Sequence, residues 1–444
     1  MTTHRTTNDP PLSADVLVIG AGMAGLAAAR TLAEAGRSVL VLESQSRIGG
    51  RILTQRIGNE IIELGAEFVH GRPPELLALI AEAGLELTER SGSFVRYEHG
   101  RLIPSDGDDN DDDRDDLFHP LEQLEDLTGP DLSFADYLDR QHIPKDHPAR
   151  SALIGYVEGF NAADHRLISA AALGLQQKAE QELEGDRAFH LTGGYDQLPA
   201  YLAQRTEQHG GALRTDTRVS RIHWQPGRVE AITNQGSFTA RQAVVTLPLA
   251  VLQSARVAFD PAPGDVLEHA RRLHMGQACR LTLHLRERFL TRLPPQPALA
   301  QLSFLFTRDK LPSVWWTVHP TPSNTFTGWV GGPRSSALLG LSAEEIGRRA
   351  CDTLAEVFHL DPGYVRDQML GCYTHNWQAD PDALGAYSYV GTGGLDAPQR
   401  MSEPVADTLY FAGEHTDTAG QWGTVHAALG SGLRTARQIL AAKL

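Results

Sequence analysis

The chain has 444 residues, of which 41% are hydrophobic and 21% are charged, so it can bury a large core and is not an intrinsically disordered protein. Its 55 acidic residues outnumber its 40 basic residues and give a formal charge of −15. This excess argues against nucleic acid as a partner, because proteins that bind nucleic acid neutralise phosphates with cationic side chains.

The N-terminal segment and the cysteines bear on the compartment. Residues 1–13 are polar and lack the apolar stretch of a signal peptide, and the sequence has no run of 18 apolar residues that would mark a membrane span. Its three cysteines, Cys279, Cys351 and Cys372, form neither a disulfide framework nor a metal-binding set. We therefore expect a soluble, cytoplasmic protein with no membrane partner and no bound metal.

The first predicted elements form a βαβ unit at residues 15–43, with a strand, a glycine turn, a helix that Gly36 ends and a second strand at 39–42. The turn has the spacing G-x-G-x-x-G, with Gly20, Gly22 and Gly25. These glycines let the backbone approach a pyrophosphate at the start of the helix. Glu43 ends the second strand, where its carboxylate can accept hydrogen bonds from a ribose. The unit predicts a dinucleotide site and leaves FAD and NAD open.

An acidic segment follows at residues 106–116. It holds eight Asp and one Arg and contributes −7 of the net charge of −15. We expect a solvated loop; capture of divalent ions or polyamines is the alternative. The negative charge would also attract a cationic substrate, but that expectation depends on where this segment lies.

Two further blocks resemble the first in character. Residues 190–262 predict a helix around Leu198–Thr206 and strands at 218–224, 228–233 and 243–246. Residues 405–444 predict a strand at 408–411, a glycine-rich turn and a helix over about 424–442. We therefore expect an α/β (mixed α+β) fold with one domain built from three segments, 12–72, 190–262 and 378–444. Two insertions, 73–189 and 263–377, would form a second, substrate-binding domain.

The sequence favours FAD over a nicotinamide cofactor. A second glycine turn flanked by arginines spans residues 47–51, and the remote segment 409–414 (LYFAGE) precedes a predicted helix. Extended FAD needs such additional backbone contacts, and a helix starting near Thr424 can direct its positive end at the flavin N1/O2 edge. The first domain is therefore predicted to be a Rossmann-like FAD-binding domain.

These motifs together resemble the flavin amine oxidase family, which includes monoamine oxidases, polyamine oxidases and the amine oxidase domain of lysine-specific histone demethylases. The resemblance runs from about Asp15 to the C-terminus. The segments that carry it are VIGAGMAGLAAARTL, SRIGGR, ELGAEFVHG, TRVSRIHW, TLPLAVL, LGAYSYV and LYFAGEHTDTAGQWGTVHAALGSGLRTA.

The resemblance implies roles for individual residues. Cofactor contacts are implied for Gly20, Gly22, Met23, Ala24, Gly25, Glu43, Gly50, Arg51, Ala66, Glu67, Val219, Gly413, Glu414, Thr424 and Val425. Among them Glu43 would hold the ribose, Arg51 the pyrophosphate region, and Glu414 the ribityl and flavin end. Catalytic positions are implied for His70, Arg280, Trp377, Tyr387 and Thr424. Tyr387 would form one wall of an aromatic cage and Trp377 would pack beside the flavin, although both residue types are also common in cores.

Three positions depart from the family pattern. Ala386 stands where monoamine oxidases carry the cysteine that tethers the flavin, so FAD is expected to bind non-covalently. Thr424 replaces the second cage tyrosine of monoamine oxidases, which would leave the cage half open. Arg280 stands where most members carry a lysine near flavin N5. It would either position water and stabilise reduced flavin as a fixed positive charge, or form a salt bridge.

His70 matches an active-site histidine of polyamine oxidases. With an ordinary pKa near 6.5 it would influence the protonation of the amine. A histidine satisfied within its own loop is the alternative interpretation.

The implied function is FAD-dependent oxidation of a primary or secondary amine to an imine and then a carbonyl compound, with oxygen as acceptor and hydrogen peroxide released. An L-amino-acid oxidase or a desaturase of the same superfamily is the first alternative, and Arg280 keeps the amino-acid oxidase open. A flavin-binding protein without turnover is the second. The expected partners are a small amine and oxygen, in a monomer or homodimer.

Overall fold

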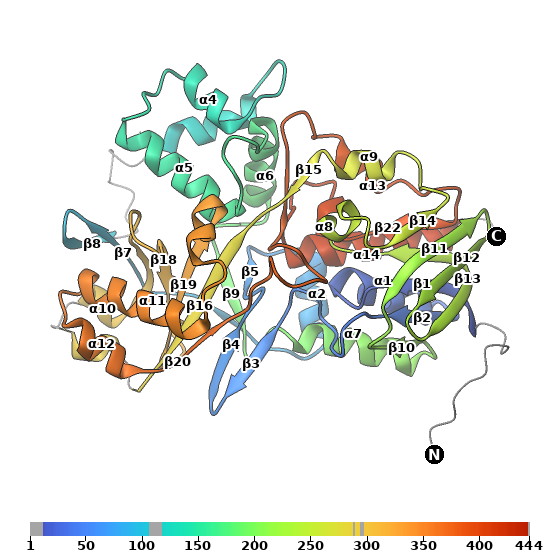
Figure 1. The fold of residues 1–444 in the computed structure, drawn as a ribbon, viewed down its shortest axis with the longest axis horizontal. Coiled ribbons are helices and arrows are strands. Elements are labelled where there is room, and N and C mark those ends of the chain that lie inside the picture. Colours follow the sequence, from blue (N-terminus) through green and yellow to red (C-terminus); the bar gives the residue numbers. More distant parts are fainter. Residues whose placement is uncertain (1–11, 106–117, 287–288, 294–296, 443–444) are drawn as a thin grey trace.

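The computed structural model describes residues 12–105, 118–286, 289–293 and 297–442. The acidic segment at 106–116 therefore lies outside the described residues. Two large sheets lie toward opposite ends of the long axis of the molecule, and smaller sheets and helices lie between and above them (Figure 1).

The larger sheet joins three segments that are far apart in the sequence. Its strand order is β10-β2-β1-β13-β12-β11-β14, and β22 also pairs with β13. The strands are β1 (Leu12–Ile19), β2 (Val39–Leu42), β10 (Ala212–Arg214), β11 (Val219–Gln225), β12 (Arg228–Thr233), β13 (Gly236–Val245), β14 (Ala258–Asp260) and β22 (Leu409–Phe411). The sheet is mixed, because β12 runs antiparallel to both of its neighbours while β1, β2, β10 and β22 run parallel to theirs. The predicted strands are confirmed, although β13 begins well before Ala243.

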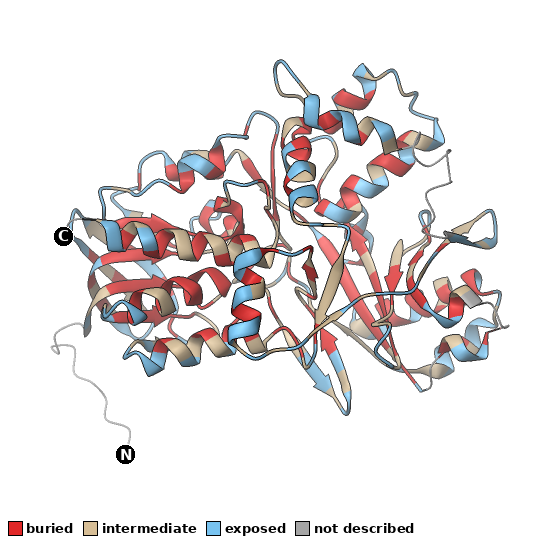
Figure 2. Cartoon of the chain, turned by 180° about the vertical axis from the view of Figure 1, so that it is seen from behind, coloured by how far each residue is buried: buried red, intermediate tan, exposed pale blue. Residues whose placement is uncertain are grey.

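Helices cover this sheet and share its core. Apolar residues of α1 (Met23–Glu34), α7 (Gln197–Gln208) and α14 (Val425–Ala441) pack with those of β1 and β2. A Cβ added at Gly432 would lie 2.2 Å from the carbonyl oxygen of Ala24, so α14 packs directly on the backbone of α1. The inner faces of these helices and the strands beneath them are buried (Figure 2). The three helices confirm the predicted ones.

The second sheet has the order β20-β16-β19-β18-β17-β7-β8 and is antiparallel except between β17 and β7. Its strands are β7 (Ser93–Glu98), β8 (Arg101–Ser105), β16 (Ala278–Leu285), β17 (Leu302–Phe306), β18 (Val314–Trp316), β19 (Thr325–Gly331) and β20 (Met369–Thr374). The helices near it are η2 (Phe289–Arg292), α10 (Pro297–Ala300), η3 (Gly332–Leu338), α11 (Ala343–Val357) and α12 (Pro362–Gln368). The apolar face of α11 packs on this sheet.

The remaining elements form smaller sheets and helices outside the two large sheets. The small sheets pair β3 (Thr54–Ile57) with β4 (Glu60–Glu63), β15 (Leu273–Met275) with β21 (Ser388–Val390), and β5 (Phe68–His70) and β6 (Leu87–Glu89) with β9 (Ala188–Leu191). The remaining helices are α2 (Pro74–Glu82), η1 (Gln123–Asp126), α4 (Phe134–Arg140), α5 (Pro148–Asn161), α6 (Ala170–Glu182), α8 (Leu249–Gln253), α9 (Val266–Ala270), α13 (Ala397–Met401) and η4 (Glu414–Thr416). Within the described ranges no helix has both the length and the apolar character needed to cross a bilayer. The predicted mixed α/β fold class is confirmed.

Candidate cofactor and substrate site

One cavity of about 1950 Å³ runs from the glycine turn after β1 to helices α5 and α6. This volume exceeds that of ordinary ligand pockets and gives room for a dinucleotide together with a substrate. All of the predicted site residues except Gly25 line it. The structure therefore brings together residues that the sequence spreads from Gly20 to Val425.

The three glycines of the turn have different roles. Gly20 has a φ of +107°. A Cβ at Gly25 would lie 2.0 Å from the carbonyl oxygen of Gly20, so Gly25 permits close packing of the turn on α1 rather than lining the cavity. A Cβ at Gly22 would have no neighbour within 4 Å, and Gly22 lines the cavity. The open backbone at Gly22 fits the cradle that a pyrophosphate needs.

Glu43 is held by the backbone at the same end of the cavity. Its Oε2 accepts a hydrogen bond from the backbone N–H of Ala21 at 2.8 Å, and its Oε1 accepts one from that of Gln45 at 2.9 Å. The side chain is buried but still lines the cavity. The carboxylate is thus oriented in advance, with lone pairs left for a ribose diol.

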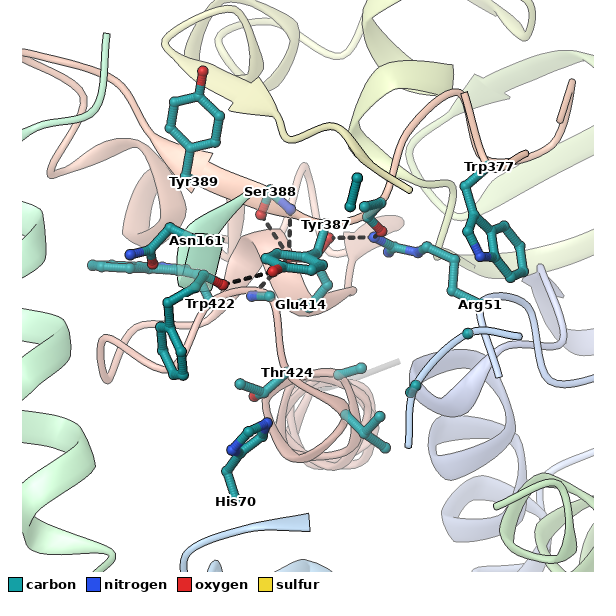
Figure 3. Close-up of a pocket in the computed structure, with 18 of the residues that line it drawn as sticks. Arg51, His70, Asn161, Trp377, Tyr387, Ser388, Tyr389, Glu414, Trp422 and Thr424 are labelled. Atoms are coloured by element: carbon teal, nitrogen blue, oxygen red, sulfur yellow. Dashed lines mark hydrogen bonds and ion pairs between the residues drawn. The ribbon is translucent and has the colours of Figure 1, made fainter. Parts of the chain in front are cut away.

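Glu414 and Arg51 form an ion pair in the middle of the cavity (Figure 3). Oε1 of Glu414 lies 2.8 Å from Nη1 of Arg51, and its Oε2 accepts hydrogen bonds from Oγ of Ser388 and the N–H of Gly423. Burial opposes ionisation of Glu414, but Arg51, His415 and the hydrogen bond from Ser388 hold its pKa below the usual range. Both carboxylate oxygens already have partners in the protein. Glu414 therefore lines the cavity with both of its oxygens already engaged by protein donors.

Thr424 is the N-cap of α14, which begins at the cavity (Figure 3). Its Oγ1 accepts a hydrogen bond from the N–H of Ala427 at 3.1 Å and donates one to the carbonyl of Gln421 at 2.7 Å. The predicted helix start is confirmed, and its positive end borders the cavity. The Thr424 hydroxyl has a capping role that the comparison with cage tyrosines did not anticipate.

Three aromatic rings line the cavity. Tyr387 donates a hydrogen bond from its hydroxyl to the carbonyl of Phe160 at 2.6 Å, and its ring lies parallel to that of Trp329 with centroids 6.4 Å apart. Trp377 donates from Nε1 to the carbonyl of Leu64 at 2.8 Å, which fixes the orientation of its ring. Sequence reasoning missed Trp329. It lies directly opposite Arg280 in the β16–β19 pair, a relationship visible only once the strand register is known.

Arg280 forms a buried salt bridge with Glu67, so the second of the two predicted alternatives is the one observed. Arg280 also donates to the carbonyl of Gly65 at 3.0 Å, and Trp316 donates from Nε1 to Glu67 at 2.9 Å. Burial opposes ionisation of Glu67, but Arg280 keeps its pKa low. Arg280 is therefore not an isolated positive charge, because Glu67 balances it. The same pairing engages the carboxylate of Glu67, which was expected to face the cofactor.

His70 lines the cavity opposite Thr424 (Figure 3). Burial and the nearby Arg90 lower its pKa to about 4, so it is neutral at pH 7. The ordinary pKa assumed from sequence is therefore wrong. A second histidine, His426 in the first turn of α14, also lines the cavity; burial and His70 lower its pKa to about 3. Sequence reasoning missed His426 because nothing in the sequence places it near His70.

Comparisons with known proteins match the whole of this architecture. The profile of the family "Flavin containing amine oxidoreductase" matches residues 23–440. Polyamine oxidase 2 of Arabidopsis thaliana is 28% identical over 96% of this chain and 87% of that protein. Putrescine oxidase of Kocuria rosea is 27% identical over 98% of this chain and 99% of its own length. Lysine-specific histone demethylase 1 homolog 2 of Oryza sativa subsp. japonica is 29% identical, and the chain spans 57% of it.

Solved structures show the same fold. Wild-type putrescine oxidase bound to putrescine superposes with a TM-score of 0.82 at 22% identity, over 98% of this chain and 100% of the other. Cyclohexylamine oxidase from Brevibacterium oxydans superposes with a TM-score of 0.80 at 22% identity, over 97% of this chain and 99% of the other.

Proposed function

The chain belongs to the family of flavin-containing amine oxidoreductases, and we propose that it oxidises a primary or secondary amine with oxygen as the acceptor. FAD is the expected cofactor of this family member. In the proposed reaction the amine loses two electrons and two protons to become an imine, and oxygen gains them to become hydrogen peroxide. Water then hydrolyses the imine to an aldehyde or ketone and releases ammonia or a smaller amine.

The single observation that carries the proposal is the convergence of the predicted residues on one cavity. The open backbone at Gly22 and the oriented carboxylate of Glu43 fit the pyrophosphate and ribose of FAD. The start of α14 at Thr424 fits the flavin end, where its dipole would stabilise negative charge. Ala386 lines the cavity and offers no thiol for covalent attachment, which supports non-covalent binding.

When bound, FAD supplies the acceptor for a hydride and passes the electrons to oxygen. The protein's own part is to hold the amine against the aromatic walls and keep it uncharged. The two carboxylates at this end, Glu67 and Glu414, are each neutralised by an arginine. The neighbouring imidazole of His70 is neutral at pH 7. Such surroundings favour the neutral amine, the form that can release a hydride from its α-carbon.

The amino-acid oxidase alternative needs an arginine free to bind a substrate carboxylate. In the sequence, Arg280 was the residue that supported this alternative. In the structure Arg280 is paired with Glu67 and is therefore not free. We therefore place amine oxidation ahead of amino-acid oxidation.

We also propose a division into two domains and a cellular compartment for the protein. Segments 12–72, 190–262 and 378–444 would form the FAD-binding domain, and 73–189 and 263–377 the substrate-binding domain. The three-stranded sheet β5-β9-β6 holds strands from both, so that sheet would be their junction. We propose a cytoplasmic location, where cysteines stay reduced, and the three cysteines are free.

Steady-state oxygen uptake tests this proposal. Primary amines, secondary amines and L-amino acids of similar size are supplied to the FAD-loaded enzyme, and peroxide and carbonyl products are measured. We expect one peroxide and one carbonyl product for each oxygen consumed with amines. Turnover of amino acids alone would support the amino-acid oxidase instead, and uptake without a carbonyl product would contradict amine oxidation.

A further inference from the structure

Arg90 is a largely buried cation behind the aromatic wall of the cavity. It follows β6, and its guanidinium carbon lies 4.8 Å from the ring centre of Phe68 and 4.1 Å from that of Phe304. Both rings line the cavity, whereas Arg90 does not. The two rings therefore stand between the guanidinium group and the cavity.

Arg90 has no counter-ion of its own. Its Nη2 donates to the hydroxyl of Ser303 at 2.9 Å and to the carbonyl of the same residue at 3.1 Å. Its Nε and Nη1 are buried without a hydrogen-bond partner, and within the described ranges no carboxylate forms an ion pair with it. The carboxylate of Glu98 on β7 lies 3.9 Å from Arg96 and 3.9 Å from Arg308. Aromatic faces stabilise a cation but leave its net charge in place.

The groups around Arg90 do not cancel its charge. Burial lowers the pKa of Arg90 to about 10, and Glu67 opposes this shift, so Arg90 is charged at pH 7. Glu67 is itself balanced by its ion pair with Arg280. His190 on β9 and His70 on β5 are neutral at pH 7, because burial lowers the pKa of each to about 4. This cluster therefore carries one net positive charge.

The charge of Arg90 reaches the reacting end of the cavity. The Phe68 ring meets the ring of His70 edge-on with centroids 5.7 Å apart, and His70 contacts the ring of Phe160 with centroids 5.9 Å apart. The carbonyl of Phe160 accepts the hydrogen bond from Tyr387, so His70 and Tyr387 border the same part of the cavity. After burial, Arg90 is the cause of the lowered pKa of His70. An amine bound there meets the same charge, because aromatic rings screen it less than water does.

We propose that Arg90 makes the reacting end of the cavity net positive and thereby excludes the ammonium form of the substrate, so that the amine binds there as the uncharged base. This inference rests on the proposed amine oxidation and names the residue that selects the reactive form of the amine. The arginine partners of Glu67 and Glu414 only balance those carboxylates. In a balanced site the faces of Tyr387 and Trp377 would attract an ammonium ion, which cannot release a hydride.

The first test measures how kcat depends on pH. R90M removes the charge and leaves an apolar side chain against the two rings, whereas R90K keeps the charge. The acidic limb of kcat reports the ionisation of the bound amine. Without Arg90 the bound amine is easier to protonate, so this limb should move up by about one pH unit in R90M, the effect of a like charge about 10 Å away. The limb should stay in place in R90K.

Two controls accompany this measurement. R101Q makes a similar charge change at an exposed position outside the cavity and should match the wild type. His70 would imitate the expected result, because removal of Arg90 also raises the pKa of His70. The double variant R90M/H70N should therefore show the same shifted limb as R90M. A shift that vanishes in the double variant would belong to His70 and would overturn the inference.

A pair of unreactive ligands separates this inference from the proposed function. An alkyltrimethylammonium ion and its neutral tert-butyl isostere have the same shape, and neither has the nitrogen lone pair that oxidation requires. Their affinities are read from the change in flavin absorbance. R90M should bind the ammonium ion roughly tenfold more tightly than the wild type does and should bind the isostere equally well. The wild type, which needs no variant, should prefer the isostere.

The outcomes decide between the two claims. If no amine is oxidised but R90M gains affinity for the ammonium ion alone, the role of Arg90 stands and the proposed reaction fails. If amines are oxidised and R90M changes neither the acidic limb of kcat nor the affinity for the ammonium ion, the inference is wrong. It is also wrong if the wild type binds the ammonium ion more tightly than the isostere.

Discussion

Nη1 of Arg51 and Oε1 of Glu414 lie 2.8 Å apart although 363 positions separate the two residues in the sequence. The pair joins the second glycine turn to the last strand and thus holds the two ends of the predicted cofactor motif against one cavity. Arg51 also donates to the carbonyl of Ala386 at 2.9 Å, and Glu414 holds Ser388. This single ion pair therefore connects three segments that meet at the site.

The first prediction concerns this ion pair. E414Q removes the charge partner of Arg51 and should lower the free energy of unfolding by about 2 kcal/mol, less than for a fully buried pair because Arg51 is partly exposed. FAD affinity should fall as well, because the loop at Gly423 loses its acceptor. Urea unfolding and flavin release measure the two effects. E403Q, on an exposed pair with Arg400, is the control and should change neither. An E414Q variant with unaltered stability would contradict the account.

The second prediction separates two glycines of one turn. G25A places a Cβ 2.0 Å from the carbonyl oxygen of Gly20 and should cost the protein about 1–3 kcal/mol of stability with or without FAD. G22A meets nothing in the protein, since Gly22 has a φ of −77° that alanine adopts. Its methyl group enters the cavity, so it should leave the stability of the apoprotein unchanged and weaken FAD binding roughly tenfold. Calorimetry of apoprotein and FAD titration measure these outcomes; equal effects of both variants on the apoprotein would argue against a pyrophosphate at Gly22.

The third prediction concerns the salt bridge between Arg280 and Glu67. R280M leaves a buried carboxylate without its cation and should destabilise the protein by about 3–5 kcal/mol. The double variant R280M/E67Q should recover part of that loss. The pH dependence of the free energy of unfolding should also reverse in R280M. In the wild type the lowered pKa of Glu67 contributes stability above about pH 4.5 that is lost as the pH falls. Without Arg280, burial would raise that pKa, and stability would decrease as the pH rises. Urea unfolding across this range decides between the two slopes.

The fourth prediction concerns His70. Its pKa is lowered from 6.5 to about 4, so it does not titrate between pH 6 and 9. The acidic limb of kcat/KM against pH should therefore report the substrate amine. H70N should keep the apparent pKa of that limb, whatever it does to the rate. A limb near pH 6.5 that disappears in H70N would show that His70 ionises in the working enzyme.

The sequence predicted those elements that depend on the spacing of neighbouring residues. The glycine turn, α1 and the start of α14 near Thr424 follow from spacing within about twenty residues. Trp329 and the partner of Arg280 could not be found this way. Trp329 meets Arg280 through strand pairing, and Glu67 meets Arg280 from the loop before β5, so both depend on register and packing.

The charges and pKa values of the site residues could be predicted from the sequence even less well than their contacts. The ordinary pKa expected for His70 and the fixed positive charge considered as one alternative for Arg280 are properties of isolated side chains, and burial and pairing change both.

Anaerobic titration of the FAD-loaded protein with amines tests the central claim most directly. We predict that a diamine bleaches the visible absorbance of the oxidised flavin completely and in stoichiometric amount, and that admitting oxygen restores it with formation of one peroxide. A flavin that no amine reduces, or a protein that takes up no FAD, would contradict amine oxidation in this cavity.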